Sequence, residues 1–382
     1  MLGLVLWWWN ELWYAVPLMR ANKRANKRLP PGHMGLPFIG DMLAFLFYFK
    51  LLRRPDEYIN AKRRKYGDNI GVFRSHLFGS ACIIACAPSV NKFVFQSEDK
   101  FRLEWPTVTL MGTTSLVAVH GKEHATLRRF VLNAINSPNS LRRITLLLQP
   151  LILSSLQSWA TKLKIKAHIE TKKMTLENIG RLFGSKEGGA ELESIDKLFD
   201  IMVKGVRAYP LNIPGFAYHI NLQEENMALK SVKTGDFITY EQLSGLKYTN
   251  KVVEETIRMA NVAAFIHRKV IKEAEYKGYH FPKGWNVILW IRYLHTNPEN
   301  FEDPLCFNPD RWNEAAKAGT YQVFGGGPRI CAGNMLARLQ LAILLHHLST
   351  GYKWELVNPE AGVKYLPHPI PEDGVEIMFS KL

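Results

Sequence analysis

The sequence is poor in cysteine, and this limits how the chain can be held together. Its 382 residues include only four cysteines, which are scattered along the chain: Cys82, Cys86, Cys306 and Cys331. A disulfide-stabilised scaffold needs a dense set of cysteines at close spacing. The sequence therefore excludes a disulfide framework and indicates thiols in a reducing compartment, with only Cys331 in an unusual setting.

Acidic residues are outnumbered, and no basic tract has the composition of a nucleic-acid module. The chain has 49 Lys and Arg against 34 Asp and Glu, which gives a formal net charge of +15. A charge of this size favours an acidic protein or an anionic membrane surface as a partner. Because the basic residues are not interleaved with aromatic ones, we expect no nucleic-acid partner. The 47% of hydrophobic residues is typical of a globular protein.

No positive charge precedes the first apolar run, so the N-terminus lacks the pattern of a cleaved signal peptide. Residues 1–19 are nearly long enough to span a bilayer as a helix, although Asn10 and Glu11 are costly in hydrocarbon. Five basic residues follow and favour a cytosolic position for the rest of the chain: Arg20, Lys23, Arg24, Lys27 and Arg28. We expect an uncleaved membrane anchor helix, with an interfacial helix as the alternative.

The remainder of the chain indicates one mainly helical domain with a minor β region. Residues 20–40 end in LPPGHMGLPFIG, whose prolines and glycines predict a stiff, irregular connector. Residues 41–382 form the expected domain. Within it, periodicity and turn residues predict helix over residues 42–65, a hairpin over 69–88, mainly helix over 89–229, short strands over 274–290 and an extended tail from 352 onward.

One glycine-rich loop has a pattern that suits metal chemistry. In VFGGGPRICAGNML the spacing is F-x-x-G-x-x-x-C-x-G, formed by Phe324, Gly327, Cys331 and Gly333. Glycines let backbone N–H groups approach a sulfur closely. Those groups, together with a following helix N-terminus, favour the thiolate form that a metal binds. The alternative for this loop alone is an ordinary turn that ends in an inert cysteine.

Two further motifs precede the loop. VVEETIRMA places Glu255 and Arg258 three residues apart on one face of a predicted helix, where they can form an ion pair. FEDPLCFNPDRWNE supplies Arg311 after two prolines, in a segment that predicts an irregular surface loop. Each motif alone is weak evidence of function. The three motifs together, in this order along the chain, are a strong signal.

The E-x-x-R helix, the P-x-R segment and the cysteine loop together resemble the cytochrome P450 family of haem-thiolate monooxygenases. The resemblance implies a cytochrome P450 fold with haem b as cofactor, Cys331 as the proximal iron ligand and Phe324 at the start of its loop. It also implies that Glu255, Arg258 and Arg311 form a buried ion-pair network behind the haem. Electrons would come from NADPH through a cytochrome reductase, whose acidic domain the basic chain suits.

The same resemblance assigns four more residues to the haem. Arg329 and Arg268 match family positions that contact the haem propionates, and Arg128 matches the basic residue of an early helix that faces the haem. His124 stands where many members carry a tryptophan. The alternative for each arginine is a solvated surface charge, because long cationic side chains are usually exposed.

A zinc site is the rival chemistry. Residues 120–124, HGKEH, fit H-x-x-E-H, in which two histidines one helical turn apart bind zinc. However, Gly121 lies inside the helix that such a site requires, and five-residue patterns recur by chance. We therefore favour haem over zinc.

Other stretches narrow the resemblance to plant members that oxidise terpenoids and steroids. They are LPPGHMGLPFIGD, GVRAYPLNIPGFAYH, PKGWNVILWIRYLHTNPENFEDP and YLPHPIPEDGVE. They are most similar to the ent-kaurenoic acid oxidases of gibberellin biosynthesis, which implies a small hydrophobic terpenoid substrate. The resemblance also implies the endoplasmic reticulum membrane, with the catalytic domain on its cytosolic side. Oxidases of other steroid or triterpenoid substrates share much of this pattern and stay as alternatives.

One family signature is missing. The helix on the distal side of the haem carries [A/G]-G-x-[D/E]-T-[T/S] in this family, and the sequence contains no such motif in the expected region. Residues 220–236, INLQEENMALKSVKTGD, are polar and leave no room for that helix. We therefore expect an internally truncated fold in which no distal catalytic residue is identified. The two functional hypotheses are a haem-dependent monooxygenase and a truncated remnant without turnover that either binds haem or is non-functional.

Overall fold

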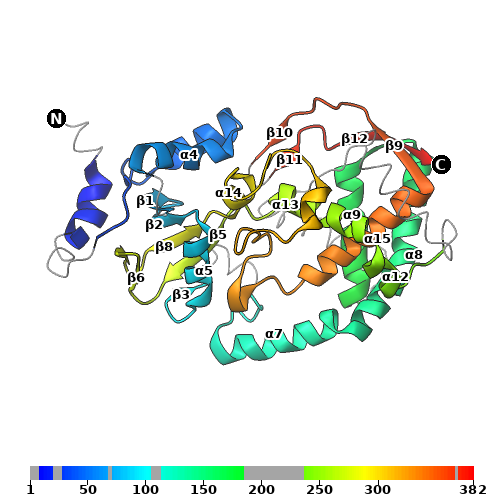
Figure 1. Cartoon of the computed structure of the whole chain (residues 1–382), viewed down its shortest axis with the longest axis horizontal. Helices are drawn as coiled ribbons and strands as arrows, with labels where there is room; N and C mark the ends of the chain where they lie inside the picture. Colours follow the sequence, from blue (N-terminus) through cyan, green and yellow to red (C-terminus); the bar gives the residue numbers. More distant parts are fainter. Residues whose placement is uncertain (1–7, 20–27, 68–70, 105–112, 185–235, 366–368) are drawn as a thin grey trace. The chain divides into compact units, whose positions relative to one another are not determined.

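The hairpin predicted over residues 69–88 forms one edge of a mixed β-sheet (Figure 1). Its strands are β1 (Val72–Leu77) and β2 (Ser80–Ala85), which pair in antiparallel register. The turn residues Phe78 and Gly79 both have positive φ, at 53° and 74°. A two-residue hairpin turn of this hand matches the twist of the flanking strands. The predicted hairpin is confirmed.

Strands from much later in the chain complete this sheet. The order is β1-β2-β8-β5-β3, in which β2 and β8 are parallel and the other neighbours antiparallel. The added strands are β8 (Asn286–Leu289), β5 (Ile266–Val270) and β3 (Phe101–Arg102). Ile83, Val287 and Leu289 are buried in one apolar core beside the sheet. A separate hairpin of β6 (Ala274–Tyr276) and β7 (Tyr279–Phe281) turns at Lys277–Gly278, within the region where the sequence predicts short strands.

The computed structural model describes residues 8–19, 28–67, 71–104, 113–184, 236–365 and 369–382. The chain forms two units, each assembled from segments that are distant in the sequence. The first unit consists of Met1–Thr126, Ala263–Leu305 and Ala316–Cys331. The second unit consists of Leu127–Val262, Cys306–Ala315 and Ala332–Leu382. Each unit has its own apolar core.

Several short helices follow residue 41 in the first unit. They are α3 (Met42–Leu46), the π-helical turn η2 (Phe47–Leu51), α4 (Pro55–Tyr66), α5 (Pro88–Gln96) and α14 (Ile291–Thr296). The single helix expected over residues 42–65 is interrupted, because Arg53 has a positive φ of 55° and Pro55 begins α4. Proline disfavours helical backbone at the preceding residue and is well suited to the first helical position.

Residues 28–40, expected to be an irregular connector, lie against β1. Gly32 forms a parallel bridge with Arg74, whose side chain donates to the carbonyl oxygen of Pro30 at 2.8 Å. Gly32 has a φ of 148°, and a Cβ there would lie 2.1 Å from the carbonyl oxygen of Arg74. Met34 is fully buried. This segment is therefore part of the first unit's packing.

The helical segment of residues 8–19 is attached to the same unit through its polar side chains. The Glu11 carboxylate accepts the backbone N–H of Met34 at 2.8 Å, and Asn10 donates to the Met34 carbonyl oxygen at 3.3 Å. Glu11 also pairs with Arg74 at 3.4 Å. In the described part of the chain, no helix has both the length and the apolar character needed to cross a bilayer, so the spanning anchor expected over residues 1–19 is not supported.

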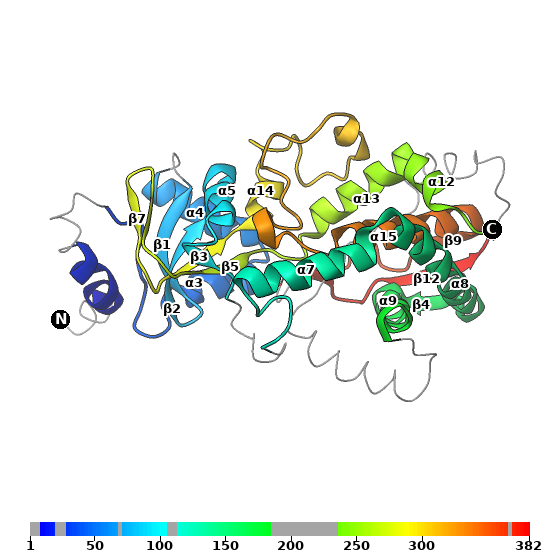
Figure 2. The same ribbon diagram turned by 90° about the horizontal axis from the view of Figure 1, so that it is seen from below.

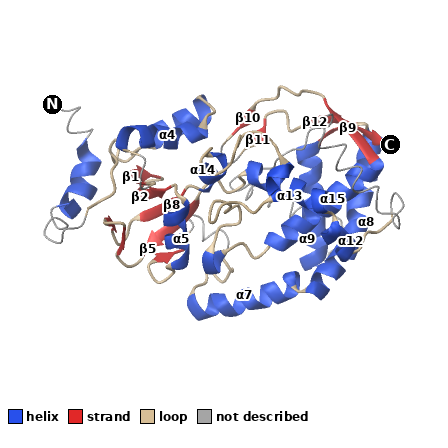
Figure 3. Cartoon of the chain, viewed as in Figure 1, coloured by secondary structure: helices blue, strands red, loops and turns tan. Residues whose placement is uncertain are grey.

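The second unit is a helical assembly with a small sheet (Figure 3). Its helices are the C-terminal part of α7 (Gly121–Asn136), α8 (Pro138–Lys162), α9 (Ala167–Gly184), α12 (Tyr240–Gly245), α13 (Lys247–Ala260) and α15 (Asn334–Gly351). Ser137 caps α8 by accepting the Ser140 N–H, and Thr239 with Gln242 forms a capping box on α12. Helices α8 and α9 lie side by side (Figure 2).

The extended tail forms the sheet of the second unit. The strands β4 (Lys164–Lys166), β12 (Glu376–Lys381) and β9 (Tyr352–Leu356) pair in that order, and β10 (Val363–Lys364) pairs with β11 (Ile370–Pro371). The sheet contributes Trp354, Ile377 and Phe379 to the core beneath α8 and α15. The expected extended tail is confirmed, and so is a mainly helical chain with a minor β region.

The core of the second unit also holds a polar network on α8 and α15. His346 and His347 are buried, and burial lowers their pKa values to about 4 and about 3. A ring nitrogen of His347 lies 3.2 Å from the side-chain oxygen of Gln149. Gln149 also bonds the backbone of Ile238 in both directions. This network ties the chain that follows residue 236 to α8.

The predicted loss of the distal helix around residues 220–236 lies outside the described residues, save for its last position.

Candidate active site

The cysteine loop closes on itself through backbone hydrogen bonds. The N–H of Cys331 donates to the carbonyl oxygen of Phe324 at 3.0 Å, and the N–H of Gly325 donates to that of Gln322 at 2.8 Å. Gly325 and Gly327 have φ values of 77° and 65°, in the left-handed region that favours glycine. The Cys331 side chain is exposed at the end of this loop. The loop therefore presents one accessible thiol in a fixed backbone frame.

Three buried side chains hold the base of this loop. His295 accepts the backbone N–H of Gln322 at 3.1 Å through its Nε2 atom. The side-chain oxygen of Gln322 accepts from Asn91 at 3.1 Å, and its amide nitrogen donates to the carbonyl oxygen of Gly319 at 2.8 Å. Because Asn91 lies on α5 and His295 on α14, two helices of the first unit fix the position where the loop begins.

The glycines are required because α5 approaches the loop backbone. A Cβ on Gly326 would lie 2.8 Å from the ring of Phe95, and one on Gly327 would lie 2.2 Å from the Phe95 carbonyl oxygen. A side chain would have to displace the Phe95 ring at position 326 and the Phe95 backbone at position 327. The glycine run is thus a steric requirement of the contact with Phe95, in addition to a source of backbone freedom.

Arg268 lies on β5 and is buried, with only 4% of its surface exposed. Its Nη1 atom donates to the backbone carbonyl oxygen of His267 at 3.0 Å, and its guanidinium lies over the ring of Phe95. Within the described chain, no carboxylate forms an ion pair with it. Burial lowers the pKa of Arg268 to about 10, while the charge of Glu98 acts in the opposite direction. A buried cation in this state suits an anionic ligand group.

Arg329 has its guanidinium surrounded by acceptors of the protein. Its Nε atom donates to the Glu98 carboxylate at 2.9 Å, and its Nη2 atom donates to the carbonyl oxygen of Val119 at 2.9 Å. Nη1 lies 3.3 Å from the carbonyl oxygen of Leu116, and Nη2 is 2.9 Å from Nδ1 of His120. Arg329 therefore joins the cysteine loop to the segment that precedes α7.

His124 and Arg128 both lie on α7, four residues apart. His124 is buried, and Arg128 is partly exposed with no hydrogen bond or ion pair to another described residue. His120 precedes the helix, which begins at Gly121 with a positive φ of 60°. The two histidines of the zinc pattern are thus not on one helix. No group of three or more His, Cys, Asp or Glu among the residues described could hold a metal ion.

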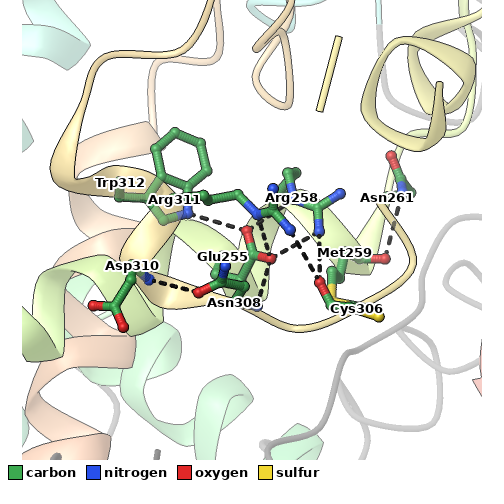
Figure 4. A network of polar contacts seen from close by, with 9 residues as sticks. All are labelled: Glu255, Arg258, Met259, Asn261, Cys306, Asn308, Asp310, Arg311 and Trp312. Atoms are coloured by element: carbon green, nitrogen blue, oxygen red, sulfur yellow. Dashed lines mark hydrogen bonds and ion pairs between the residues drawn. The ribbon is translucent and has the colours of Figure 1, made fainter. Parts of the chain in front are cut away.

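Glu255 and Arg258 of α13 meet Arg311 in the second unit (Figure 4). Arg258 donates to both carboxylate oxygens of Glu255 at 2.8 Å, and Arg311 donates to one of them at 2.9 Å. The indole of Trp312 and the backbone N–H of Asn308 also donate to Glu255, at 3.1 Å and 2.9 Å. Five hydrogen bonds therefore converge on one carboxylate.

The electrostatics of this network favour an ionised Glu255. Burial by itself raises the pKa of Glu255, but hydrogen bonds and positive charge from Arg258, with further bonds from Asn308 and Arg311, bring it below its ordinary value of 4.5. Glu255 and Arg258 have no exposed side-chain surface. Arg258 and Arg311 each also contact the carbonyl oxygen of Cys306. The network thus binds residues 306–312 to α13.

Several contributors to these two sites carry no local sequence signal. Phe95 and Glu98 are more than two hundred residues from the loop they contact, since Glu98 and Arg329 are 231 positions apart. His295 belongs to an apolar stretch that predicts only a short buried element. Trp312 is different, because it directly follows Arg311 and could have been included with the P-x-R segment.

The steric contact with Phe95 predicts different costs for two glycine substitutions. Gly327→Ala should lower the free energy of unfolding by at least about 2 kcal/mol, because left-handed backbone and backbone overlap both act against it. Gly278→Ala is the matched control, since Gly278 has a φ of 78° and nothing within 4 Å of its Cβ position, and it should cost about 1 kcal/mol. Urea unfolding measures both, and equal losses would contradict the role of Phe95.

The buried network predicts a large loss of stability on removal of its one carboxylate. Glu255→Gln leaves two guanidiniums without their counter-ion and should cost about 3–5 kcal/mol at neutral pH. Because the pKa of Glu255 is lowered, this stabilisation is present above pH 4.5 and is lost as the pH falls through the folded-state value. The difference between the wild type and the variant should therefore shrink in acid. Glu241→Gln, which breaks the exposed pair with Arg142, is the control and should leave the unfolding midpoint unchanged.

Comparison with known proteins gives matches along most of the chain. A cytochrome P450 family model matches residues 218–368. The chain is 28% identical to ent-kaurenoic acid oxidase from Oryza sativa subsp. japonica, over 97% of this chain and 91% of the relative. It is 27% identical to abscisic acid 8'-hydroxylase 4 from Arabidopsis thaliana, over 97% of this chain and 99% of that relative. The alignment with the rice protein has 466 positions, more than the whole chain, so that relative contains stretches without a counterpart here.

A solved structure has the same fold. The retinoic acid bound cyanobacterial CYP120A1 superposes with a TM-score of 0.74 at 19% sequence identity, covering 93% of this chain and 100% of that chain. The cytochrome P450 family implies haem iron as the cofactor, with electrons supplied by a reductase. The family match, the plant relatives and the shared fold agree with one another, and the chain is similar in sequence and in fold to the cytochrome P450 monooxygenases.

Proposed function

We propose that this chain binds haem b through Cys331 and oxidises a plant terpenoid, with ent-kaurenoic acid as the first substrate to test. The observation that carries the proposal is the exposed Cys331 thiol at the end of a rigid, hydrogen-bonded loop. The similarity to the rice ent-kaurenoic acid oxidase supports the choice of substrate. Another steroid or triterpenoid is the alternative substrate, and the relatives also include an abscisic acid 8'-hydroxylase.

The residues of the first unit fit the cofactor. Cys331 supplies an accessible sulfur, and Arg268 supplies a buried guanidinium that has no carboxylate partner among the described residues. Haem carries two carboxylates and an iron atom that accepts a thiolate, so both groups have a matching partner. When bound, haem iron activates dioxygen, and thiolate ligation favours cleavage of the O–O bond. Phe95 and the glycines keep the loop in place while this occurs.

A haem-binding chain without turnover is the second candidate function. The sequence lacks the family's distal signature, and the alignment with the rice relative shows that internal stretches of that protein have no counterpart here. A missing distal threonine and acid would leave proton delivery to bound oxygen without its usual groups, whereas the residues of the cysteine loop are present. Both candidate functions therefore require that Cys331 binds haem iron, and only the first requires that a substrate is oxidised.

Ligation and turnover are tested on one preparation. The haem-loaded, reduced chain should give a thiolate-type Soret band with carbon monoxide, and Cys331→Ser should abolish that band while leaving the fold intact by circular dichroism. A thiolate-type band that persists in Cys331→Ser would contradict the proposal. With NADPH, a cytochrome reductase and ent-kaurenoic acid, formation of an oxidised product supports the monooxygenase. A normal spectrum without product supports the second candidate.

We also propose that the chain works at the endoplasmic reticulum membrane, on its cytosolic side, where it meets the reductase. Large apolar side chains are exposed on the N-terminal elements of the first unit: Trp8, Trp9, Leu12, Trp13, Phe38, Ile39, Leu43, Phe47, Leu51 and Phe78. Tryptophan is favoured at the membrane interface, and the exposed basic residues Lys50, Arg53 and Arg54 suit anionic headgroups. Because Asn10 and Glu11 are bonded to Met34, we favour a helix that lies in the interface.

Vesicle binding tests this membrane surface. Trp13→Ser combined with Phe38→Ser removes two side chains that are 69% and 86% exposed, and should weaken binding to phosphatidylserine-containing vesicles by about tenfold or more. Phe130→Ser, which removes a ring that is 73% exposed in the second unit, is the matched control and should bind as the wild type does. Flotation measures the bound fraction. Equal binding of the double variant and the wild type would contradict the assignment of this surface.

A further inference from the structure

A groove of about 320 Å³ lies in the first unit, beside α3, η2 and α4. Two charged side chains, Asp41 and Lys62, line it and form an ion pair with each other. Part of its wall is apolar and consists of Leu36, Leu43, Ala44 and Tyr48. None of the described residues that line the groove belongs to the cysteine loop, so it is a separate site.

The Asp41 carboxylate is bonded through one of its two oxygens. Asp41 precedes α3, where an aspartate usually caps a helix, but its side chain makes no capping bond. Its Oδ2 atom accepts the hydroxyl of Tyr58 at 2.7 Å and that of Ser75 at 3.1 Å, and it also accepts from Lys62. Among the residues that the structure describes, none donates to Oδ1. Because both oxygens of a carboxylate are acceptors, Oδ1 can accept from a ligand.

The Lys62 ammonium has the complementary property of unused donors. Lys62 lies on α4, and its side chain is only 10% exposed. One of its three N–H groups donates to Asp41, and the ammonium lies 4.8 Å from the centroid of the Tyr58 ring. Within the described chain it has no second hydrogen-bond acceptor. Asp41 and Lys62 together can therefore accept one hydrogen bond and donate another, which matches a hydroxyl group.

The groove continues into the proposed membrane surface. Leu43 lines the groove and is 55% exposed, and Phe47 and Leu51 follow it at intervals of four residues with exposed side chains. Leu43, Tyr48 and Lys50 also fit L-x4-Y-x-K, a form of the short pattern proposed for sterol contact. A ligand that enters from a bilayer therefore needs an apolar body and one polar end.

We propose that this groove binds a membrane sterol, whose hydroxyl donates to Oδ1 of Asp41 and accepts from Lys62 while its rings lie against Leu43 and Tyr48. The inference rests on the proposed membrane surface. Ligand sites hold about 300–1,000 Å³, so a groove at the lower limit takes the hydroxyl end and leaves the tail in the bilayer. Lys65 also lines the groove, so a carboxylate ligand is the contrasting case, which the free oxygen of Asp41 disfavours.

Competition binding in detergent micelles tests the groove without a membrane. The full chain is titrated with tritiated 5α-cholestan-3β-ol, and unlabelled ligands compete with it. The matching ketone, 5α-cholestan-3-one, cannot donate to Oδ1 and should compete about tenfold less well than the alcohol. We expect ent-kaurenoic acid not to compete. Displacement by this acid at the concentrations at which the alcohol acts would assign the groove to carboxylates and overturn the inference.

Asp41→Asn should remove the preference for the alcohol. Because Tyr58, Ser75 and Lys62 all donate to Oδ2, the amide oxygen takes that position and the amide NH₂ group faces the groove. The ketone should then compete at least as well as the alcohol, whereas a purely structural role of Asp41 would weaken both alike. Asp56→Asn removes a carboxylate that pairs with Arg292, away from the groove. It is the matched control and should keep the wild-type preference.

Ala44→Phe fills the groove and leaves the charged pair in place, so it should abolish binding of both sterols while circular dichroism shows an intact fold. It should float with sterol-free phosphatidylserine vesicles as the wild type does. Sterol binding that is unchanged in both Ala44→Phe and Asp41→Asn would place the sterol elsewhere and overturn the inference, as would a wild type without saturable sterol binding. Wild-type chain that binds sterol in micelles but does not float would refute only the proposed membrane surface.

Discussion

The contact between α5 and the glycine run is the constraint on which the candidate site depends. Phe95 occupies the space that side chains at positions 326 and 327 would need, so that loop and helix can approach only where the loop has no Cβ atoms. The same approach brings Glu98 to Arg329 and the ring of Phe95 to Arg268. One steric contact thus sets the position of the thiol and of both cations.

Buried arginines serve two different purposes in this chain. Arg258 and Arg311 share the Glu255 carboxylate, with a backbone carbonyl oxygen as a further acceptor, so their charges are compensated within the fold. Their role is to hold a loop against α13. Arg268 is as deeply buried but has no such partner among the residues that the structure describes. A buried arginine whose charge is balanced by a carboxylate of the fold has a structural role. A buried arginine without such a partner is a candidate ligand-binding group.

In the proposed haem site the cysteine loop would supply the thiol side, and the sequence lacks the signature that the family carries on the opposite side. The cysteine loop is held in place by contacts within the first unit. Proton delivery depends on groups that the family carries on another helix. The proposed haem binding and the proposed turnover therefore depend on different residues.

The sequence by itself determined the local features: the β1–β2 hairpin, the apolar helix after Cys331 and the pairing of Glu255 with Arg258, which are three residues apart on one helix. Backbone periodicity and turn residues are short-range properties, so a pattern is enough to predict them. Only the tertiary structure decided that Phe95 abuts the glycines, that Glu98 takes Arg329 and that Glu11 turns toward Met34. These contacts join segments distant in the chain, and their partners are selected by packing and charge compensation, which local spacing does not encode.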